Sequence, residues 1–311
     1  MAKLARKMLL LAIKESVSGT EEVPTAANVM LVRAFTPALI TAEYVGRDNI
    51  KPYMGSNPQL ATGIHRQFEF EVELAGSGTP GTPPAWADLL DCCGMPDTTN
   101  AGSPGEVHFG LISESLPTMT MYGYLDGIRF KLTGARGTCV FTMNSKAIPV
   151  MQFRFIGEYS IAEDVTFPTG ISYSSFISPG TVGKVFSQSF TLHGVTVCMQ
   201  SLSIDLANAL SYRDLVGCGG PTISNRLPTA TAVFELTTMA QKNWGETIKN
   251  SDSGSMQFIH GRTAGNIMTF DAPAVTCSNA TLQEADGISM LSVSLSLNPV
   301  LGNDELVLTL Q

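Results

Sequence analysis

The sequence predicts a mainly β protein made of two related halves, because one strand pattern occurs twice and other landmarks repeat with it. From residue 291 to 297, leucine or valine alternates with serine. That period of two gives a strand one apolar and one hydroxyl face. The preceding pair, Asp286 and Gly287, favours the positive φ angles of a tight hairpin turn. Residues 151–155 alternate in the same way in the earlier half.

Three further features recur around these strands in the same order. Each half has a strand ending in Glu-Leu, then one of the two tryptophans in a short predicted helix, then a cysteine in an extended run. The matched features are residues 70–74 with 233–236, Trp86 with Trp244, and Cys139 with Cys277, preceded by residues 44–50 and 204–210. A repeated order of this kind predicts an internal duplication.

The chain length and the positions of proline and glycine set the expected domain boundaries. The 311 residues are enough for two domains of ordinary size. Abundant Gly, Ser, Thr and Pro are typical of folds with many short strands joined by turns. We expect an N-terminal arm over 1–36, a first domain over 37–160, a linker over 161–180 and a second domain over 181–311, which ends in a strand over 305–311.

The N-terminal segment imitates a signal peptide, since three basic residues precede the apolar residues 8–13. The apolar run is too short, and Lys14 and Glu15 follow it without a small-residue cleavage site. We interpret the segment as a short amphipathic arm that docks on a neighbouring surface. No stretch is long and apolar enough to predict a transmembrane helix.

Charge and cysteine usage limit the function classes. Nineteen basic and 27 acidic residues give a formal net charge of −8, with no basic cluster beyond the N-terminus. Proteins that bind DNA tightly neutralise its phosphates with Lys and Arg, so this balance argues against tight binding but not against DNA passing nearby. The six cysteines form no Cys-x-x-Cys pair. We interpret them as small buried hydrophobic residues in a reducing compartment.

Candidate chemical motifs are weak. Residues 76–81 match Gly-x-Gly-x-x-Gly, but prolines hold the loop extended and no parallel βαβ unit follows, which disfavours a dinucleotide site. Glu69, Glu71 and Glu73 share one strand face. Neighbouring carboxylates on it are ~7 Å apart, which is too far for both to bind one cation. The four histidines lack metal-ligand spacing and are interpreted as ordinary surface or strand residues. The sequence therefore predicts no catalytic, cofactor or metal site.

One resemblance covers most of the chain. The series from Arg66 through residues 73–78 and Pro84-Ala85-Trp86 to Cys93-Gly94 resembles the major tail tube proteins of bacteriophages with long non-contractile tails. The later hairpin and the Leu-rich terminal strand resemble the closing strands of a tail-tube domain. The resemblance implies two tandem tail-tube-type β-sandwich or half-barrel domains, each with a short α-helix and a long β-hairpin.

The resemblance also implies a structural role in the virion tail, with assembly in the host cytoplasm. Single-domain members of the family form stacked six-membered rings, so two fused domains imply a trimeric ring of pseudo-sixfold symmetry. The implied partners are further copies of the chain, the tape-measure protein, and the tail terminator and distal tail proteins, while DNA passes through the lumen without tight binding. No membrane contact is implied. We take Glu71, Glu73, Glu235 and Glu284 as candidate lumen-facing acidic residues.

The loops over 75–84 and 97–105 are larger in the first half, and they are either contacts between rings or ordinary surface loops. Three alternative functions remain open on sequence alone. A glycan-binding or decoration β-sandwich would show clustered exposed aromatic residues, and a β-rich hydrolase would need a carboxylate pair or a nucleophile and base. The tube protein of a contractile injection system is a closer alternative, although such proteins usually have one domain.

Overall fold

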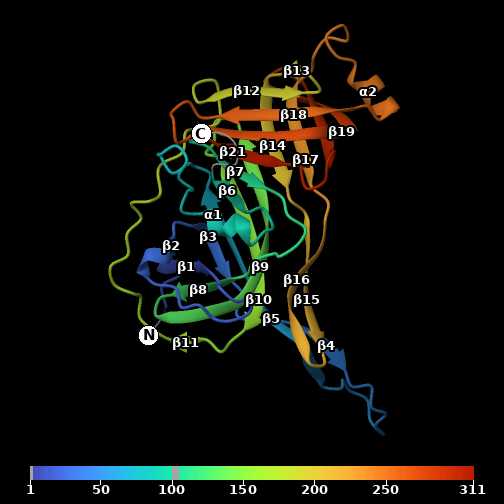
Figure 1. The fold of residues 1–311 in the computed structure, drawn as a ribbon. Helices are drawn as coiled ribbons and strands as arrows, with labels where there is room; N and C mark the ends of the chain where they lie inside the picture. Colours follow the sequence, from blue (N-terminus) through green and yellow to red (C-terminus); the bar gives the residue numbers. More distant parts are fainter. Residues whose placement is uncertain (1–2, 100–104) are drawn as a thin grey trace.

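The computed structural model describes residues 3–99 and 105–311 and confirms a mainly β fold (Figure 1). One continuous antiparallel sheet contains nineteen strands in the described part of the chain, and two further strands form a separate ribbon. The strands and helices are β1 Met8–Lys14, the 3-10 turn η1 Ala26–Asn28, β2 Val29–Met30, β3 Arg33–Pro37, β4 Thr41–Gly46, β5 Gln59–Glu73, α1 Ala87–Asp91, β6 Asp97–Thr99, β7 Val107–Gly110, β8 Met119–Leu125, β9 Ile128–Asn144, β10 Val150–Tyr159, β11 Glu163–Asp164, β12 Ser187–Leu192, β13 Val195–Thr196, β14 Met199–Asp205, β15 Asn208–Leu215, β16 Cys218–Arg226, β17 Thr229–Glu235, α2 Trp244–Asn250, β18 Ser253–His260, β19 Met268–Ala285, β20 Ile288–Asn298 and β21 Val307–Leu310.

The strand pairings follow one order in each half of the chain. In the first half the neighbours run β2, β1, β8, β9, β10, β5 and β3. In the second half they run β13, β12, β18, β19, β20, β17 and β14. In both series the longest strand lies at the centre: β9, which pairs with β10, and β19, which pairs with β20.

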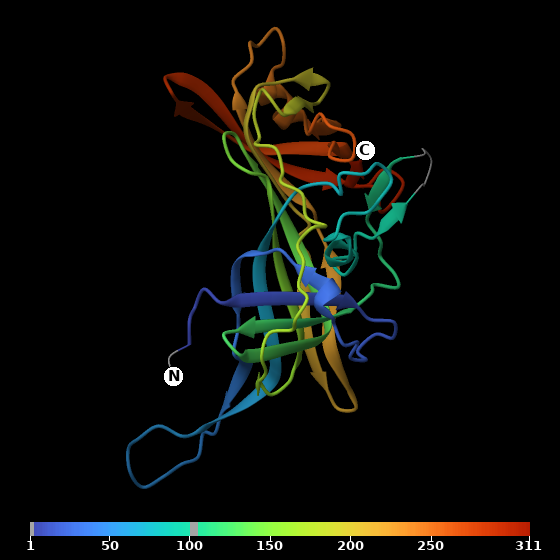
Figure 2. The ribbon, with the colours of Figure 1, turned by 90° about the vertical axis from the view of Figure 1, so that its left-hand side faces the viewer.

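The two series are joined by strand pairing between the halves. The end of β9 pairs with β10 on one side and with β14 on the other. The terminal strand β21 pairs with β19 of the second half and with β7 of the first. Figure 2 shows the long strands running through both parts of the molecule, with the N-terminal strands low and the C-terminal strands high. The halves therefore share one sheet.

Tight turns join the strands of two long hairpins. Asp286 and Gly287 join β19 to β20 with φ angles of 53° and 78°, which confirms the predicted turn. Asp126 and Gly127 join β8 to β9 in the same conformation, with φ angles of 40° and 86°. Two successive positive φ values match the right-handed twist of the flanking strands.

Both predicted tryptophan helices are present. The Trp86 side chain is buried before α1, where its indole nitrogen donates to the carbonyl of Ala75 at 2.8 Å. In the second half, Trp244 begins α2 and its indole nitrogen donates to Thr237 Oγ1 at 2.9 Å. Each indole thus ties its helix to the chain that follows the preceding strand. No helix in the described residues is long and apolar enough to cross a membrane.

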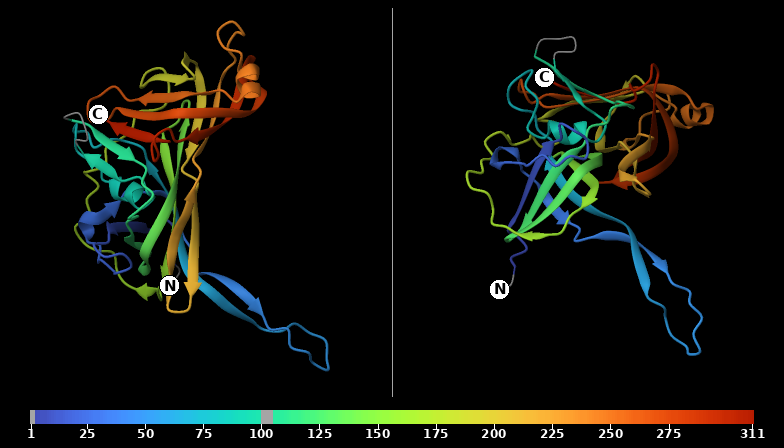
Figure 3. Two further views of the ribbon diagram at one scale, coloured as in Figure 1. Left: turned by 45° about the vertical axis from the view of Figure 1, so that its right-hand side comes forward. Right: turned by 60° about the horizontal axis from the view of Figure 1, so that its bottom comes forward.

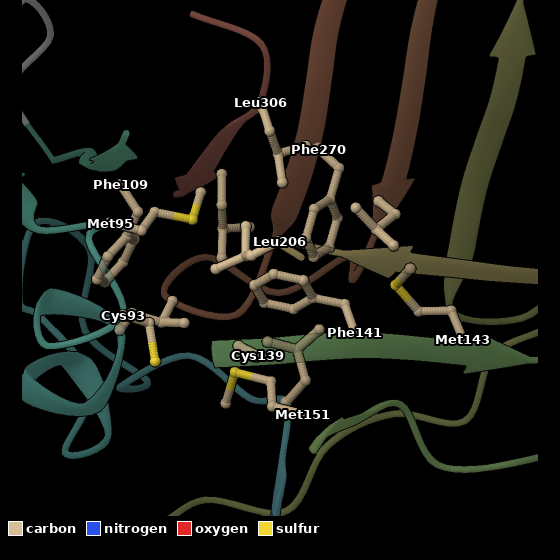
Figure 4. Close-up of a cluster of buried hydrophobic side chains, with 14 of the residues drawn as sticks. Cys93, Met95, Phe109, Cys139, Phe141, Met143, Met151, Leu206, Phe270 and Leu306 are labelled. Carbon is tan, nitrogen blue, oxygen red and sulfur yellow. The ribbon is translucent and has the colours of Figure 1, made fainter. Parts of the chain in front are cut away.

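The hydrophobic core crosses the boundary between the halves (Figure 4). Phe141 of β9 meets Phe270 of β19 edge to face, with ring centroids 5.1 Å apart. Both rings are fully buried. The two halves consequently bury their apolar faces in one core.

The N-terminal arm is the first correction to the sequence-based expectations. Residues 8–14 form strand β1, which pairs with β8 along its whole length. Leu10 and Ala12 lie in the main core, while Leu9 and Leu11 pack on the other side with Tyr122. Because both faces of β1 are buried within its own chain, the segment does not dock on a neighbouring surface.

Further differences from the expectations concern two cysteines and two segments expected to lack strands. Cys198 and Cys218 are exposed, whereas the remaining four cysteines are buried as expected. The predicted linker is mostly irregular but contains β11, and Phe167 of this segment packs on Tyr124. The predicted polar loop over 97–105 contains β6, and its residues 100–104 lie outside the described residues.

Register decides which landmarks correspond. Cys139 lies opposite Phe153, and Cys277 lies opposite Leu295, so the two cysteines occupy the same place in β9 and β19. Phe153 and Leu295 in turn lie opposite Phe70 and Ala230. Counting forward from Phe70 and Ala230, Glu71 corresponds to Thr231 and Glu73 to Val233. The Glu-Leu pair of the second half begins at Glu235, so this landmark is out of register by two residues.

Candidate functional site: a polar sheet face and two open strand edges

One face of the shared sheet is polar across the strands from β5 to β19. Residues that lie directly opposite in antiparallel strands point to the same side, so the register carries this face from strand to strand. Its members are Glu69, Glu71 and Glu73 in β5, Gln152 and Arg154 in β10, Thr138 and Thr142 in β9, Ser201, Ser203 and Asp205 in β14, Thr229, Thr231 and Glu235 in β17, Ser292, Ser294 and Ser296 in β20, and Thr276 and Ser278 in β19.

The polar face exists because each strand alternates. On β5 the intervening residues Phe68, Phe70 and Val72 are buried in the core. On β20 the serines alternate with Val293 and Leu295, which are also buried. A one-residue slip of either strand would expose the whole apolar set, so core burial fixes which side chains face outward.

The face is hollowed where the halves meet. A concavity of about 500 Å³ lies over β3, β5, β10, β9 and the end of β14. Its polar lining includes Glu69, Glu71, Arg154 and Asp205. Gln152 Nε2 donates to Glu71 Oε1 at 3.3 Å, and Arg33 Nη1 lies 3.8 Å from Glu73 Oε1. These weak, solvated contacts leave the carboxylates free to set a negative potential.

The two halves of the face differ in the kinds of polar side chain they present. In the first half, β5 and β10 contribute three carboxylates and one guanidinium. In the second half, β17 and β20 contribute mainly hydroxyl groups, with Glu235 near the end. Asp205 of β14 adds a second carboxylate to the second half, so the two halves of the face carry the same formal net charge.

Three of the four candidate lumen residues lie together on this face: Glu71, Glu73 and Glu235. Glu284 is exposed at the tip of the β19–β20 hairpin, where Thr281 lies opposite Ser292 and Glu284 alternates to the other side. The hydroxyl-bearing residues of β14, β17 and β20 complete the face but were not among the four candidates. Their Ser and Thr alternation was visible in the sequence, whereas their alignment with β5 depends on the fold. That any of them faces a lumen stays a prediction.

Two strand edges bound the face. At one side β3 pairs with β5 and presents its other edge, on which Arg33, Ala34 and Thr36 are exposed. At the other side β19 pairs with β20 beyond residue 278, and residues 279–284 are exposed. An open strand edge carries unpaired backbone donors and acceptors that can pair with another strand.

Comparison with known proteins now identifies the kind of protein. A family model described as phage tail tube protein matches residues 5–298. The chain belongs to the phage tail tube protein family. No curated protein matches it significantly. The tail tube protein is accordingly a structural component of the virion tail rather than an enzyme, and its family implies that it polymerises with itself.

The glycine motif of this tail tube protein has a packing role. Gly76 N donates to Asn266 Oδ1 at 2.7 Å, and Gly78 N donates to the carbonyl of Gly265 at 3.0 Å. A Cβ atom on Gly76 would lie 2.0 Å from that Gly265 oxygen. Glycine is therefore required here because two backbone segments approach each other closely. The segment matches the pattern of a nucleotide-binding motif in sequence only.

The titratable groups of the tail tube protein offer no chemical centre. Among the described residues, no group of three or more His, Cys, Asp or Glu could hold a metal ion. Burial raises the pKa of Cys277 to about 11, which keeps the thiol protonated beside His193. Burial raises the pKa of the buried thiols Cys92, Cys93 and Cys139 as well. A thiol held protonated is a poor nucleophile.

Proposed function

We propose that three copies of this chain close a ring of pseudo-sixfold symmetry and that the rings stack into the tube of a long non-contractile tail. The genome passes through the lumen during ejection. The observation that carries the proposal is the pairing of β14 with the end of β9, because it is a junction between the two halves of one chain. The same junction, made between chains, would continue the sheet into a closed barrel.

Register supports the equivalence of the two junctions. Within the chain, β14 pairs with Val140 to Asn144, on the side of β9 that β10 leaves free. The matching segment of β19 begins at Ser278, because Cys139 and Cys277 occupy the same place. The strand that matches β14 is β3, since both flank the strand opposite the central hairpin. The proposed contact therefore joins β3 of one subunit to residues 278–284 of the next.

The chain is proposed to be a tandem duplication of the tail-tube domain. The repeated pairings support a first unit over about residues 8–159 and a second over about 187–298, with β21 paired to strands of both. These boundaries extend the first domain back from residue 37, because β1, β2 and β3 match β12, β13 and β14. Residues 160–186 connect the units.

The polar sheet face is proposed to line the lumen. Carboxylates repel DNA phosphates, and hydroxyl groups hydrate the wall without carrying charge, so the genome can slide rather than bind. Glu69, Glu71, Glu73 and Glu235 are the proposed acidic lumen residues, with Glu284 at the subunit edge. The tape-measure protein would occupy this lumen before ejection, and the terminator and distal tail proteins would cap the two ends.

Electron microscopy of the purified protein tests the proposal. We expect hollow tubes or rings whose end-on averages show six similar lobes and whose mass equals three chains. The variant Ala280→Lys places a charge on the open edge of β19 and should leave a folded monomer that no longer assembles. Rings of six chains, or a protein that stays monomeric alone and is absent from virion tubes, would overturn the trimeric arrangement. Virions with a contractile sheath would overturn the assignment to a non-contractile tail.

A further inference from the structure

Each half of the chain extends a two-stranded ribbon from matched strands. The first ribbon consists of β4 and the beginning of β5, residues 41–65, and the second consists of β15 and β16, residues 208–226. Counting back equally from Phe70 and Ala230, Ala61 corresponds to Pro221. Their cross-strand partners, Tyr44 and Tyr212, therefore correspond as well.

Part of the second ribbon, around Tyr212 and Pro221, packs on the first half of its own chain. The Tyr212 ring stacks on His65, with centroids 5.1 Å apart and an interplanar angle of 18°. Gly63 N donates to Asp214 Oδ2 at 2.9 Å, and Arg136 Nη1 donates to the carbonyl of Pro221 at 2.9 Å. As a result Pro221 is buried in the middle of the ribbon.

Apart from Gly63 and His65, which meet the second ribbon, the first ribbon is mostly uncovered, and its residues 43–50 and 58–62 are exposed. It projects away from the body of the molecule (Figure 3). Tyr44 is 63% exposed, and Ala61, which corresponds to the buried Pro221, is also exposed. The remaining large exposed apolar residues on the ribbon and its base are Leu39, Ile40, Val45, Leu60 and Ile64, and Ile50, Tyr53 and Met54 follow at its tip. The successive pairs Tyr44–Ala61 and Val45–Leu60 point to opposite sides, so the ribbon exposes apolar residues on both faces, which marks it as an interaction surface.

The base of the first ribbon is rigid. The Arg66 guanidinium is buried, where Nη2 donates to the carbonyl of Leu39 and Nη1 donates to that of Lys131. It also stacks on the rings of Tyr159 and Phe130, at 4.8 Å and 5.4 Å from their centroids. Burial holds the pKa of Arg66 below its usual value. A fixed base means that the direction of the ribbon is set before a partner arrives.

We propose that the first ribbon lies across the second half of a neighbouring copy, as the second ribbon lies across the first half within one chain. The inference rests on the proposed ring. It adds a second contact to the strand junction, the packing of this ribbon on the neighbouring copy, which we call the clasp. By correspondence, Tyr44 meets the residue that matches His65. That residue is Asn225 in β16, which is exposed. The partner is therefore a second copy of this chain, and the contact is heterologous.

The internal arrangement selects a second copy as the partner. The first half has a receiving surface that is occupied by the second ribbon, and the second half has the corresponding surface without a ribbon. Near Asn225 this surface presents Leu227 and Val300, which are exposed apolar residues matching Gln67 and Glu158 of the first half. In a closed ring of identical copies, the uncovered ribbon of each chain would pack on the uncovered receiving surface of the next.

Paired cysteines test the clasp. The exposed Cys198 and Cys218 are first replaced by serine, and then Tyr44→Cys and Asn225→Cys are introduced together in the full chain. After treatment of assembled protein with a short bismaleimide, we expect interchain bands on a denaturing gel that end at three chains. His65→Cys with Tyr212→Cys is the matched positive control, because it should cross-link within one chain and add no mass. Tyr44→Cys alone is the negative control.

The outcomes separate the clasp from the ring. A ladder ending at three chains supports both. Tubes that are visible by microscopy but give no interchain bands, while the internal control reacts, overturn the clasp and leave the proposed function standing. A wild-type chain that forms no rings or tubes and is also absent from virion tubes overturns the proposed function and the clasp with it. As a second measurement, Tyr44→Ala should raise the critical concentration for assembly roughly tenfold, whereas Tyr212→Ala should lower monomer stability.

Discussion

The two halves of the sheet use the same strand register but fill it with different side chains. On the core side, Phe70 stacks on Phe153 and Phe155, with ring centroids 5.6 and 5.9 Å away. The matching position in the second half is Ala230, beside Leu295. On the polar side, the three carboxylates of β5 in the first half correspond mostly to hydroxyl groups of β17 in the second. The shared architecture is therefore kept by pairing and burial, while volume and charge are free to differ.

The aromatic cluster gives the largest expected effect. Phe70→Ala removes a buried ring from a stack of three and should lower the free energy of unfolding by about 3–5 kcal/mol. The matched change in the opposite direction, Ala230→Phe, should cost about 1–3 kcal/mol because the second-half core is already filled. Denaturant unfolding of the monomer measures both. A cost below about 1 kcal/mol for Phe70→Ala would show that the halves are filled to different densities.

The next largest change in the free energy of unfolding is expected from a pair of residues whose volumes compensate across neighbouring strands. Gly137 lies opposite Phe155, whereas the matching pair in the second half is Val275 opposite Leu297. A Cβ on Gly137 would lie 2.7 Å from the Phe155 ring. Gly137→Val should therefore destabilise by about 1–3 kcal/mol. Adding Phe155→Leu should recover part of that loss, with a coupling of about 0.5–3 kcal/mol in a double-mutant cycle.

Strict additivity of these two changes would contradict the match between the pairs. The reverse exchange, Val275→Gly with Leu297→Phe, is the control in the second half. It should also show favourable coupling, because it recreates the first-half pair in the same register. Unfolding in denaturant again provides the measurement.

Acid sensitivity should be greater in the second half. Burial lowers the pKa of His260 and of His193 below the ordinary 6.5. His260 Nε2 donates to the carbonyl of Gly180, and its Nδ1 forms a hydrogen bond with Ser187 Oγ. Below pH 6.5 the unfolded chain binds more protons at these sites than the folded chain, so stability falls as the pH drops through this range.

Thermal unfolding between pH 7.5 and pH 5 measures this effect, and hydrogen exchange localises it to strands β12 and β18. His260→Gln keeps hydrogen-bonding groups but removes the titration, so it should flatten the profile. An unchanged slope in this variant together with His193→Gln would assign the pH dependence to other groups.

The polar face gives the smallest effect on folding. Glu71→Thr exchanges a residue for its second-half counterpart and should change the free energy of unfolding by less than about 0.5 kcal/mol, because the side chain is solvated. Tubes should still form. In contrast, Glu69→Lys with Glu71→Lys should leave assembly intact but slow DNA release, since phosphates would then be held. Release rates equal to wild type would argue against a luminal position.

The parts of the fold predicted from sequence were those with local periodicity. Serine alternation in β20, the turn at Asp286 and the tryptophan helices each depend on neighbouring residues. Strand β1 was missed because it is buried on both faces, by Leu10 on one side and Leu11 on the other, so it reads as a continuous apolar run without a period of two. Its cover includes Phe167 of the connecting segment, which no local pattern links to it.

The candidate site was predicted in part for the same reason. The alternation of Glu71 and Glu73 showed that they share a strand face. Their continuity with Thr231 and Ser294 depends on the pairing of β9 with β14, which joins segments far apart in the sequence. The register error in the Glu-Leu landmark has the same origin, because only cross-strand partners distinguish a match from a two-residue offset.

The pairing of β14 with β9 also bears on how the proposed ring would assemble. A ring of three chains contains six junctions between domains, and half of them are already made within the chains. A tethered pair meets at an effective concentration on the order of millimolar, independent of how much protein is dissolved. Only the remaining three junctions require encounters between molecules. Nucleation should therefore rise with the third power of subunit concentration, where a ring of six separate domains would require the sixth.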